Sequence, residues 1–128
     1  MPRTCRVLVA LLVALLLTWS LPAAPIARVM TLDNPIRLPF SGFASSLAVI
    51  GDVDGDGIAD YLVGAYDHRV NSNEHQGRAF VFSGRSGNLL YTIDNPHPMA
   101  YAAFGLAVAA TGDLNQDRVS DLLIGAFG

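Results

Sequence analysis

The sequence predicts an all-β fold, specifically part of a β-propeller made of four-stranded antiparallel blades. Two observations lead to this prediction. Residues 31–67 align without a gap to residues 92–128, and 13 of the 37 pairs are identical. The apolar runs inside one repeat are short, and outside the N-terminal run no segment shows a 3.6-residue apolar period over helical length. Short strands repeated at a fixed period are typical of a propeller, which arranges four-stranded sheets around an axis.

The N-terminal residues 1–24 have the pattern of a secretory signal peptide. Arg3 and Arg6 precede an unbroken apolar run at residues 7–17, and small residues follow at 22–24. The run is shorter than the roughly 20 apolar residues of a membrane span, which favours a cleaved signal peptide. An uncleaved membrane anchor is the alternative. We therefore expect cleavage between residues 24 and 27, and a mature chain that is secreted, periplasmic or held at the cell surface.

The composition of the mature chain argues against a nucleic-acid partner and against stabilisation by disulfide bonds. Without the signal segment, six arginines face eleven carboxylates, which gives a charge of about −5 and no basic surface for nucleic acid. The single cysteine, Cys5, lies in the signal segment, so the mature chain has no disulfide. A small exported domain without disulfides needs another source of stability, and a bound metal is one candidate.

One full repeat contains four short runs that predict four strands. They cover residues 47–50, 61–66, 78–83 and 89–93, and the residues 83–87 predict a hairpin turn between the last two. Four antiparallel strands are the content of one propeller blade.

The chain holds about one and a half such blades, whereas a closed propeller needs roughly four to eight. We therefore expect a truncated chain and further blades of the same protein, with residues 28–128 forming the repeat region. A complete two-unit domain that forms oligomers is the alternative. Residues 31–35 align with 92–96 and predict an outermost fourth strand whose own blade is otherwise absent.

An aspartate-rich loop at residues 52–60 carries the strongest chemical signal. Four carboxylates converge in one tight turn and would repel each other without a cation. Hard oxygen ligands in this number suit Ca²⁺, and Gly57 provides the positive φ that folds the loop back. The predicted ligands are the side chains of Asp52, Asp54, Asp56 and Asp60 and the carbonyl of Ile58.

A second copy of this loop covers residues 113–121. It keeps three of the four aspartates, and an asparagine replaces the other. Arg118 stands at the position of the turn glycine, so we expect a strained backbone and a weaker site. The predicted ligands are Asp113, Asn115, Asp117 and Asp121 with the carbonyl of Val119.

Other calcium motifs fit the loops less well. An EF-hand needs a bidentate glutamate at its twelfth position, but the loops have Val63 and Ile124 there, and the flanking segments are strand-like. A dockerin fails at the same position, and thrombospondin-type repeats would need cysteines. A plain turn without metal remains the alternative for both loops.

The pattern resembles the FG-GAP repeat of integrin α-subunit propellers and their relatives. Phe104-Gly105 precedes the second loop and Gly125-Ala126 follows it, while the first copy reads Phe43-Ala44 and Gly64-Ala65. The resemblance implies calcium in the hairpin between the first and second strands of a blade. Three departures from the motif are Arg118, Ala44 in place of glycine, and aromatic residues in place of its proline.

In this repeat we expect Phe43 and Phe104 to pack between adjacent blades, and Gly64 and Gly125 to allow close sheet packing. Hairpin alternation places the calcium loops on one face and residues 67–76 and 95–102 on the other. We expect a partner, if any, on that second face, where the loop offers His68, Arg69, Asn71, Asn73 and His75. The three histidines are expected to be surface residues.

The resemblance and the calcium loops predict an extracellular binding or adhesion module, with a protein or glycan as partner and calcium in a structural role. The alternative is an accessory propeller domain of a larger secreted hydrolase or phospholipase-like enzyme, and a purely structural spacer is a third possibility. No catalytic motif occurs in these residues, so we do not expect the chain itself to be an enzyme.

Overall fold

The computed structural model describes residues 30–128, and these residues form six strands and no helix. The strands are β1 (Phe43–Val49), β2 (Tyr61–Ala65), β3 (Arg78–Phe82), β4 (Leu89–Asp94), β5 (Val108–Gly112) and β6 (Asp121–Ile124). The all-β prediction is confirmed.

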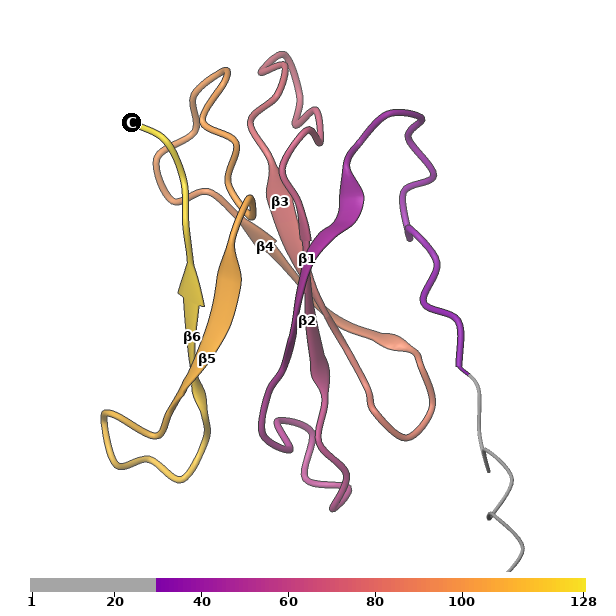
Figure 1. Cartoon of the computed structure of the whole chain (residues 1–128), viewed down its shortest axis with the longest axis vertical. Coiled ribbons are helices and arrows are strands. Elements are labelled where there is room, and N and C mark those ends of the chain that lie inside the picture. Colours follow the sequence, from indigo (N-terminus) through magenta and orange to yellow (C-terminus); the bar gives the residue numbers. More distant parts are fainter. Residues whose placement is uncertain (1–29) are drawn as a thin grey trace, which may run out of the picture.

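The first four strands form one antiparallel sheet in the order β1-β2-β3-β4, and β5 and β6 form a separate antiparallel pair (Figure 1). In the sheet, Val49 lies opposite Tyr61 and Tyr61 lies opposite Phe82. In the separate pair, Val108 lies opposite Ile124. The structure therefore contains one complete blade and the first two strands of the next, as the repeat predicts.

The central strands β2 and β3 are buried on both faces, because neighbouring residues of a strand point to opposite sides of the sheet. Alternate side chains therefore enter two different apolar clusters. One cluster contains Ile50, Leu62, Ala79, Val81 and Phe104, and the other contains Val63, Ala65, Phe80 and Phe82.

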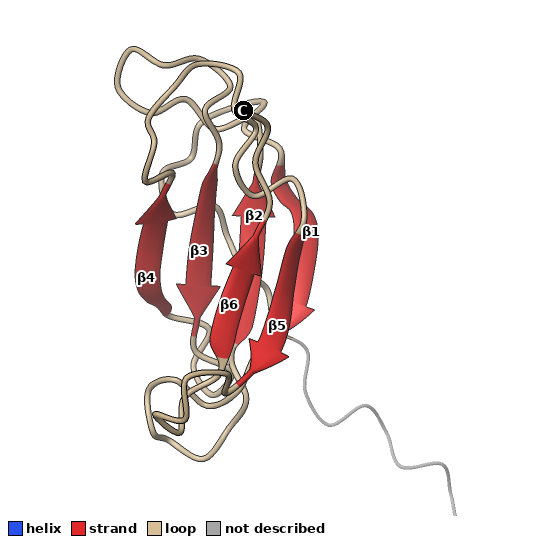
Figure 2. Ribbon diagram, turned by 90° about the vertical axis from the view of Figure 1, so that its left-hand side faces the viewer, coloured by secondary structure: helices blue, strands red, loops and turns tan. Residues whose placement is uncertain are grey.

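The pair β5–β6 packs on one face of the four-stranded sheet, next to β1 and β2 (Figure 2). Phe104 precedes β5 and lies in the buried cluster of the first blade, with 6% of its surface exposed. The prediction that this phenylalanine packs between blades is confirmed. Its counterpart Phe43 packs against the cluster on the opposite face of the sheet.

Gly64 allows the two repeats to approach each other closely. A Cβ at this position would lie 2.0 Å from the Gly105 carbonyl oxygen and 2.2 Å from Ser46 Oγ. The Ser46 hydroxyl donates a hydrogen bond to the same carbonyl at 2.8 Å. Gly125, the equivalent residue of the second repeat, is not crowded, since its Cβ would lie 3.6 Å from the nearest described atom.

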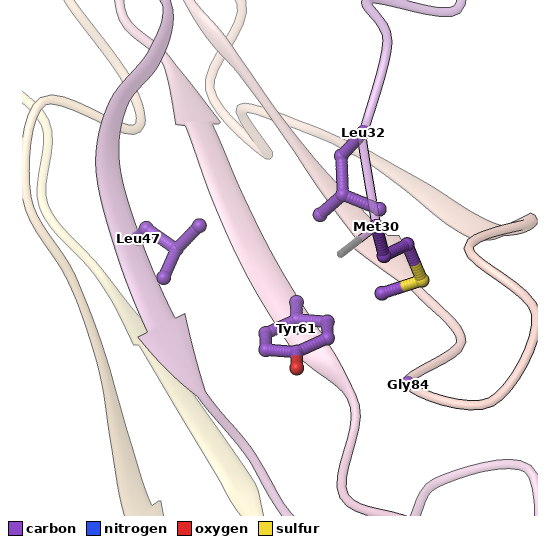
Figure 3. Close-up of a pocket in the computed structure, with 5 residues that line it drawn as sticks. All are labelled: Met30, Leu32, Leu47, Tyr61 and Gly84. Carbon is purple, nitrogen blue, oxygen red and sulfur yellow. The ribbon is translucent and has the colours of Figure 1, made fainter. Parts of the chain in front are cut away.

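The segment before β1 lies beside the second face of the sheet. Met30 and Leu32 lie across from Leu47 and Tyr61 and line with them a hollow of about 570 Å³ (Figure 3). The prediction of a strand at residues 31–35 is wrong, because these residues have no strand conformation. A strand requires a hydrogen-bonded neighbour, and within residues 30–128 no strand pairs with this segment.

The predicted signal peptide at residues 1–24 and its cleavage region lie outside the described residues. Within residues 30–128, no helix reaches the length and hydrophobicity of a membrane span.

Candidate metal centre

The loop at residues 52–60 connects β1 to β2, and its base is closed by backbone hydrogen bonds. The amide of Ile50 donates to the carbonyl of Asp60 at 2.8 Å, and the amide of Asp60 donates to the carbonyl of Gly51 at 3.4 Å. The strands therefore hold the first and last aspartates of the motif close together. The loop lies at one end of the sheet, at the bottom of Figure 1.

Asp52 organises the turn by accepting three backbone hydrogen bonds. Its Oδ1 accepts from Gly55 at 2.7 Å and Asp56 at 3.0 Å, and its Oδ2 accepts from Gly57 at 2.7 Å. These bonds, above all the one from Gly57, lower the pKa of Asp52, although desolvation opposes the shift. The glycines at 55 and 57 have φ of 80° and 85°, so they supply the left-handed conformation that the turn requires.

Asp60 is completely buried and ties the loop to the β3–β4 turn. Its Oδ2 accepts a hydrogen bond from Val53 N at 2.8 Å, and its Oδ1 accepts one from Gly84 N at 2.8 Å. A buried carboxylate of this kind needs such partners, because an unpaired buried charge is costly. Asp60 therefore links the two turns at this end of the blade.

Three of the predicted ligands converge. The carboxylates of Asp52, Asp54 and Asp60 each place an oxygen within 4.8 Å of the others. Among residues 30–128 this is the one group of three acidic side chains that comes so close. Oxygen atoms at this spacing are the donor set that Ca²⁺ prefers, and the residues therefore fit a calcium ion.

Asp56 lies outside this group of three and is instead paired with an arginine. Arg85 Nε donates to Asp56 Oδ2 at 3.0 Å, and Arg85 Nη2 donates to the Asp56 carbonyl oxygen at 2.6 Å. Asp56 Oδ1 accepts a hydrogen bond from the amide of Ile58 at 2.8 Å. Ile58 is the fifth predicted ligand residue, through its carbonyl oxygen. Arg85 is not among the predicted site residues, although hairpin alternation places its turn on the same face as the loop.

The second loop repeats the hydrogen-bond pattern of the first. Asp113 accepts hydrogen bonds from the amides of Asp117 at 3.0 Å and Arg118 at 2.8 Å. Asp52 accepts the equivalent bonds from Asp56 and Gly57 in the first loop. Asp117 Oδ1 accepts from Val119 N at 2.8 Å, and Asn115 Oδ1 accepts from the amide of Asp117 at 3.0 Å.

Two features distinguish the second loop. Its residues are more exposed, and Asp121 is only partly buried, whereas Asp60 is completely buried. Arg118 adopts φ of 72°, in the left-handed region that is unfavourable for a residue with a side chain. The expected backbone strain at Arg118 is therefore confirmed.

The loops at residues 67–76 and 95–102 lie at the opposite end of the sheet, as hairpin alternation predicts (Figure 1). His68, however, is only 1% exposed, so the prediction that it is a surface residue is wrong. Its ring packs edge-on against Phe80, with the ring centres 5.9 Å apart. The turn after β2 folds the residue back onto the sheet, because the His68 amide donates to the Ala65 carbonyl at 3.1 Å.

Comparison with known proteins agrees with this geometry. Residues 43–82 match the family model of the FG-GAP repeat. The chain is 33% identical to integrin alpha-11 of Homo sapiens over 103 residues, which are 77% of this chain and 9% of that protein. It is 42% identical to integrin alpha-E of Homo sapiens over 91 residues, or 67% of this chain and 8% of that protein. The chain thus spans less than a tenth of the length of these relatives.

Proposed function

We propose, since this chain belongs to the FG-GAP, integrin α-like family, that it is a calcium-binding part of an extracellular β-propeller with a role in binding or adhesion. The charged start and apolar run of residues 1–24 support export, because they have the pattern of a signal peptide. The proposed role is binding and not catalysis.

The convergence of Asp52, Asp54 and Asp60 in one hairpin carries the proposal. Three carboxylates within 4.8 Å of each other repel strongly unless a cation offsets their charge. The hydrogen bonds to Asp52 favour its ionised form, which is the form that binds a metal. The loop is thus arranged to hold negative charge at one point.

In the proposed first site, a calcium ion would supply the positive charge that offsets the carboxylates. Asp56 can join the three converging carboxylates if Arg85 Nε releases its Oδ2, and the carbonyl of Ile58 is the remaining donor. The second site would use Asp113, Asn115, Asp117, the carbonyl of Val119 and Asp121. We propose weaker binding there, because Arg118 places a positive charge in the loop.

The proposed role of calcium is structural. Asp60 joins the loop to the β3–β4 turn through Gly84 N, so an ion beside Asp60 would rigidify two of the three turns of the blade. The opposite end of the blade remains available for a partner outside the cell. Further blades of the same protein are part of this proposal.

Isothermal titration calorimetry of the purified protein with Ca²⁺ and with Mg²⁺ tests the proposal. We expect calcium binding in the range of about 10⁻⁴–10⁻³ M that extracellular modules show, and weaker binding of Mg²⁺. Asp54→Ala removes a ligand from an exposed part of the loop and should weaken the stronger site at least about tenfold. Asp33→Ala is the matched control, since this exposed carboxylate lies outside both loops. Equal affinities for wild type and Asp54→Ala would contradict the assignment.

A further inference from the structure

A second hollow, of about 260 Å³, lies at the end of the blade opposite the metal loops. Two connections form it, the one before β1 and the one between β2 and β3. Its volume lies below the roughly 300–1,000 Å³ of a pocket for a drug-sized ligand, so it suits one ring-sized group. Its lining residues are Pro39, Phe40, Asp67, Arg69, Glu74 and His75.

Phe40 contributes an exposed apolar ring to the lining of this hollow. The residue is 93% exposed and has φ of 56°, a conformation that is costly for a bulky side chain. The turn around it is fixed, because Asn34 Nδ2 donates to Ser41 Oγ at 2.9 Å and the Asp67 amide donates to the Ser41 carbonyl at 3.1 Å. The backbone that carries this exposed aromatic ring is therefore tied to the other wall of the hollow.

The equivalent residue of the second repeat is also aromatic. Tyr101 has φ of 62° and is 66% exposed, and its ring stacks on His75 with the ring centres 5.0 Å apart. The Tyr101 amide donates to the Glu74 carbonyl at 2.9 Å. The β2–β3 connection thus bonds to the backbone of Tyr101 on one side and, on the other, to the backbone of Ser41, the residue that follows Phe40.

The polar groups of the hollow provide both acceptors and donors. Asp67 is paired with the His75 ring, and Arg69 Nε donates to the Asn71 carbonyl at 3.1 Å. Within residues 30–128, the carboxylate of Glu74 and the terminal amino groups of Arg69 have no protein partner. One negative and one positive group therefore remain available, and their charges balance.

We propose that this hollow binds one neutral sugar ring of a glycan, an inference that rests on the proposed binding function and names its ligand class. The C–H face of a sugar can pack on the Phe40 ring, as apolar faces do on aromatic side chains. Its hydroxyl groups can donate to Glu74 and accept from Arg69, which satisfies charged groups with directed hydrogen bonds. A neutral sugar can satisfy both Glu74 and Arg69 with its hydroxyl groups, whereas a ligand of a single charge would pair with one of them and leave the other unpaired.

Saturation-transfer-difference NMR with D-glucose, D-galactose and D-mannose, each at millimolar concentration, tests the inference on the purified protein. At least one hexose should receive saturation, strongest at the ring C–H protons that face Phe40. Phe40→Ala and Glu74→Gln should each weaken binding about tenfold, the size of one lost contact. Tyr91→Ala is the control, because Tyr91 is an exposed aromatic residue on β4 outside this hollow.

Three results would overturn the sugar site: no saturation of any hexose, equal binding by Phe40→Ala and wild type, or binding of the peptide Gly-Arg-Gly in place of the sugars. Circular dichroism verifies that each variant is folded, and Glu74→Gln serves as the second test if Phe40→Ala is not. A calcium titration of the same sample separates the two proposals. Calcium binding without a sugar signal would overturn the sugar site and leave the proposed calcium function standing.

Discussion

Gly64→Ala should break the contact between the two repeats. The added methyl group would lie 2.0 Å from the Gly105 carbonyl oxygen, whereas ordinary contacts begin at about 3.5 Å. Ser46 Oγ, at 2.2 Å, can rotate away, but it then loses its hydrogen bond to that carbonyl. The backbone at Gly105 has to move by more than about 1 Å, and β5 moves with it.

Overpacking of this kind costs about 1–3 kcal/mol, and the lost hydrogen bond costs about 1 kcal/mol. We therefore expect a destabilisation of about 3 kcal/mol, which lowers the Tm of a domain of this size by more than about 10 °C. Thermal unfolding followed by circular dichroism measures the effect.

Gly125→Ala is the matched control, because it stands at the same position in the second repeat. Its methyl group would lie 3.6 Å from the Ala107 carbonyl oxygen, an ordinary contact. We expect a change of less than about 0.5 kcal/mol, or a slight stabilisation, since alanine has less conformational freedom than glycine in the unfolded chain. Equal Tm values for the two variants would refute the close approach of the repeats at Gly64.

Two further predictions concern single residues. Burial is the main cause that lowers the pKa of His68, and the nearby Arg78 adds to it while Asp94 opposes it. Between the lowered pKa and about pH 6.5 the unfolded chain therefore binds more protons than the folded one. In this window the protein should lose up to about 1.4 kcal/mol of stability for each unit by which the pH falls. His68→Gln should flatten this dependence in urea unfolding at several pH values, and an unchanged slope would contradict the burial of a neutral ring. Arg118→Gly should tighten calcium binding at the second loop roughly threefold to tenfold by removing a positive charge, and it also relieves the strain at φ of 72°. Calorimetry measures this change. The reverse substitution, Gly57→Arg, should weaken calcium binding at the first loop. Unchanged calcium affinity in both variants would contradict the equivalence of the two positions.

The regular part of the fold follows closely from the sequence. The apolar runs predicted β2, β3 and β4 to within about one residue, because β2 and β3 are buried on both faces and therefore read as continuous apolar segments. The strand β1 begins at Phe43, earlier than its apolar run, since Ala44 and Ser45 are exposed residues in a strand irregularity. The repeat itself predicted β5 and β6 from their counterparts.

The rest depends on contacts between distant residues. Arg85 reaches Asp56 across 29 residues, and no local pattern shows which side chain a turn will present to its neighbour. His68 lies in a polar stretch that reads as a loop, but the turn at Asp67 directs its ring toward Phe80. Residues 31–35 repeat the sequence of a strand, yet a strand also needs a partner that the sequence of the segment does not contain.

Thermal unfolding of the wild-type protein in calcium, in magnesium and in EDTA tests the central claim most directly. The unfolding transition should be cooperative, and its Tm should rise in calcium. At a calcium concentration of 100 times the Kd, the stabilisation is about 2.7 kcal/mol, which raises the Tm by roughly 10 °C or more. Magnesium should raise the Tm by less. Asp54→Ala should show a smaller shift and an unchanged transition in EDTA. A folded protein whose Tm is the same in all three conditions would contradict calcium binding and reduce the aspartate loops to ordinary turns.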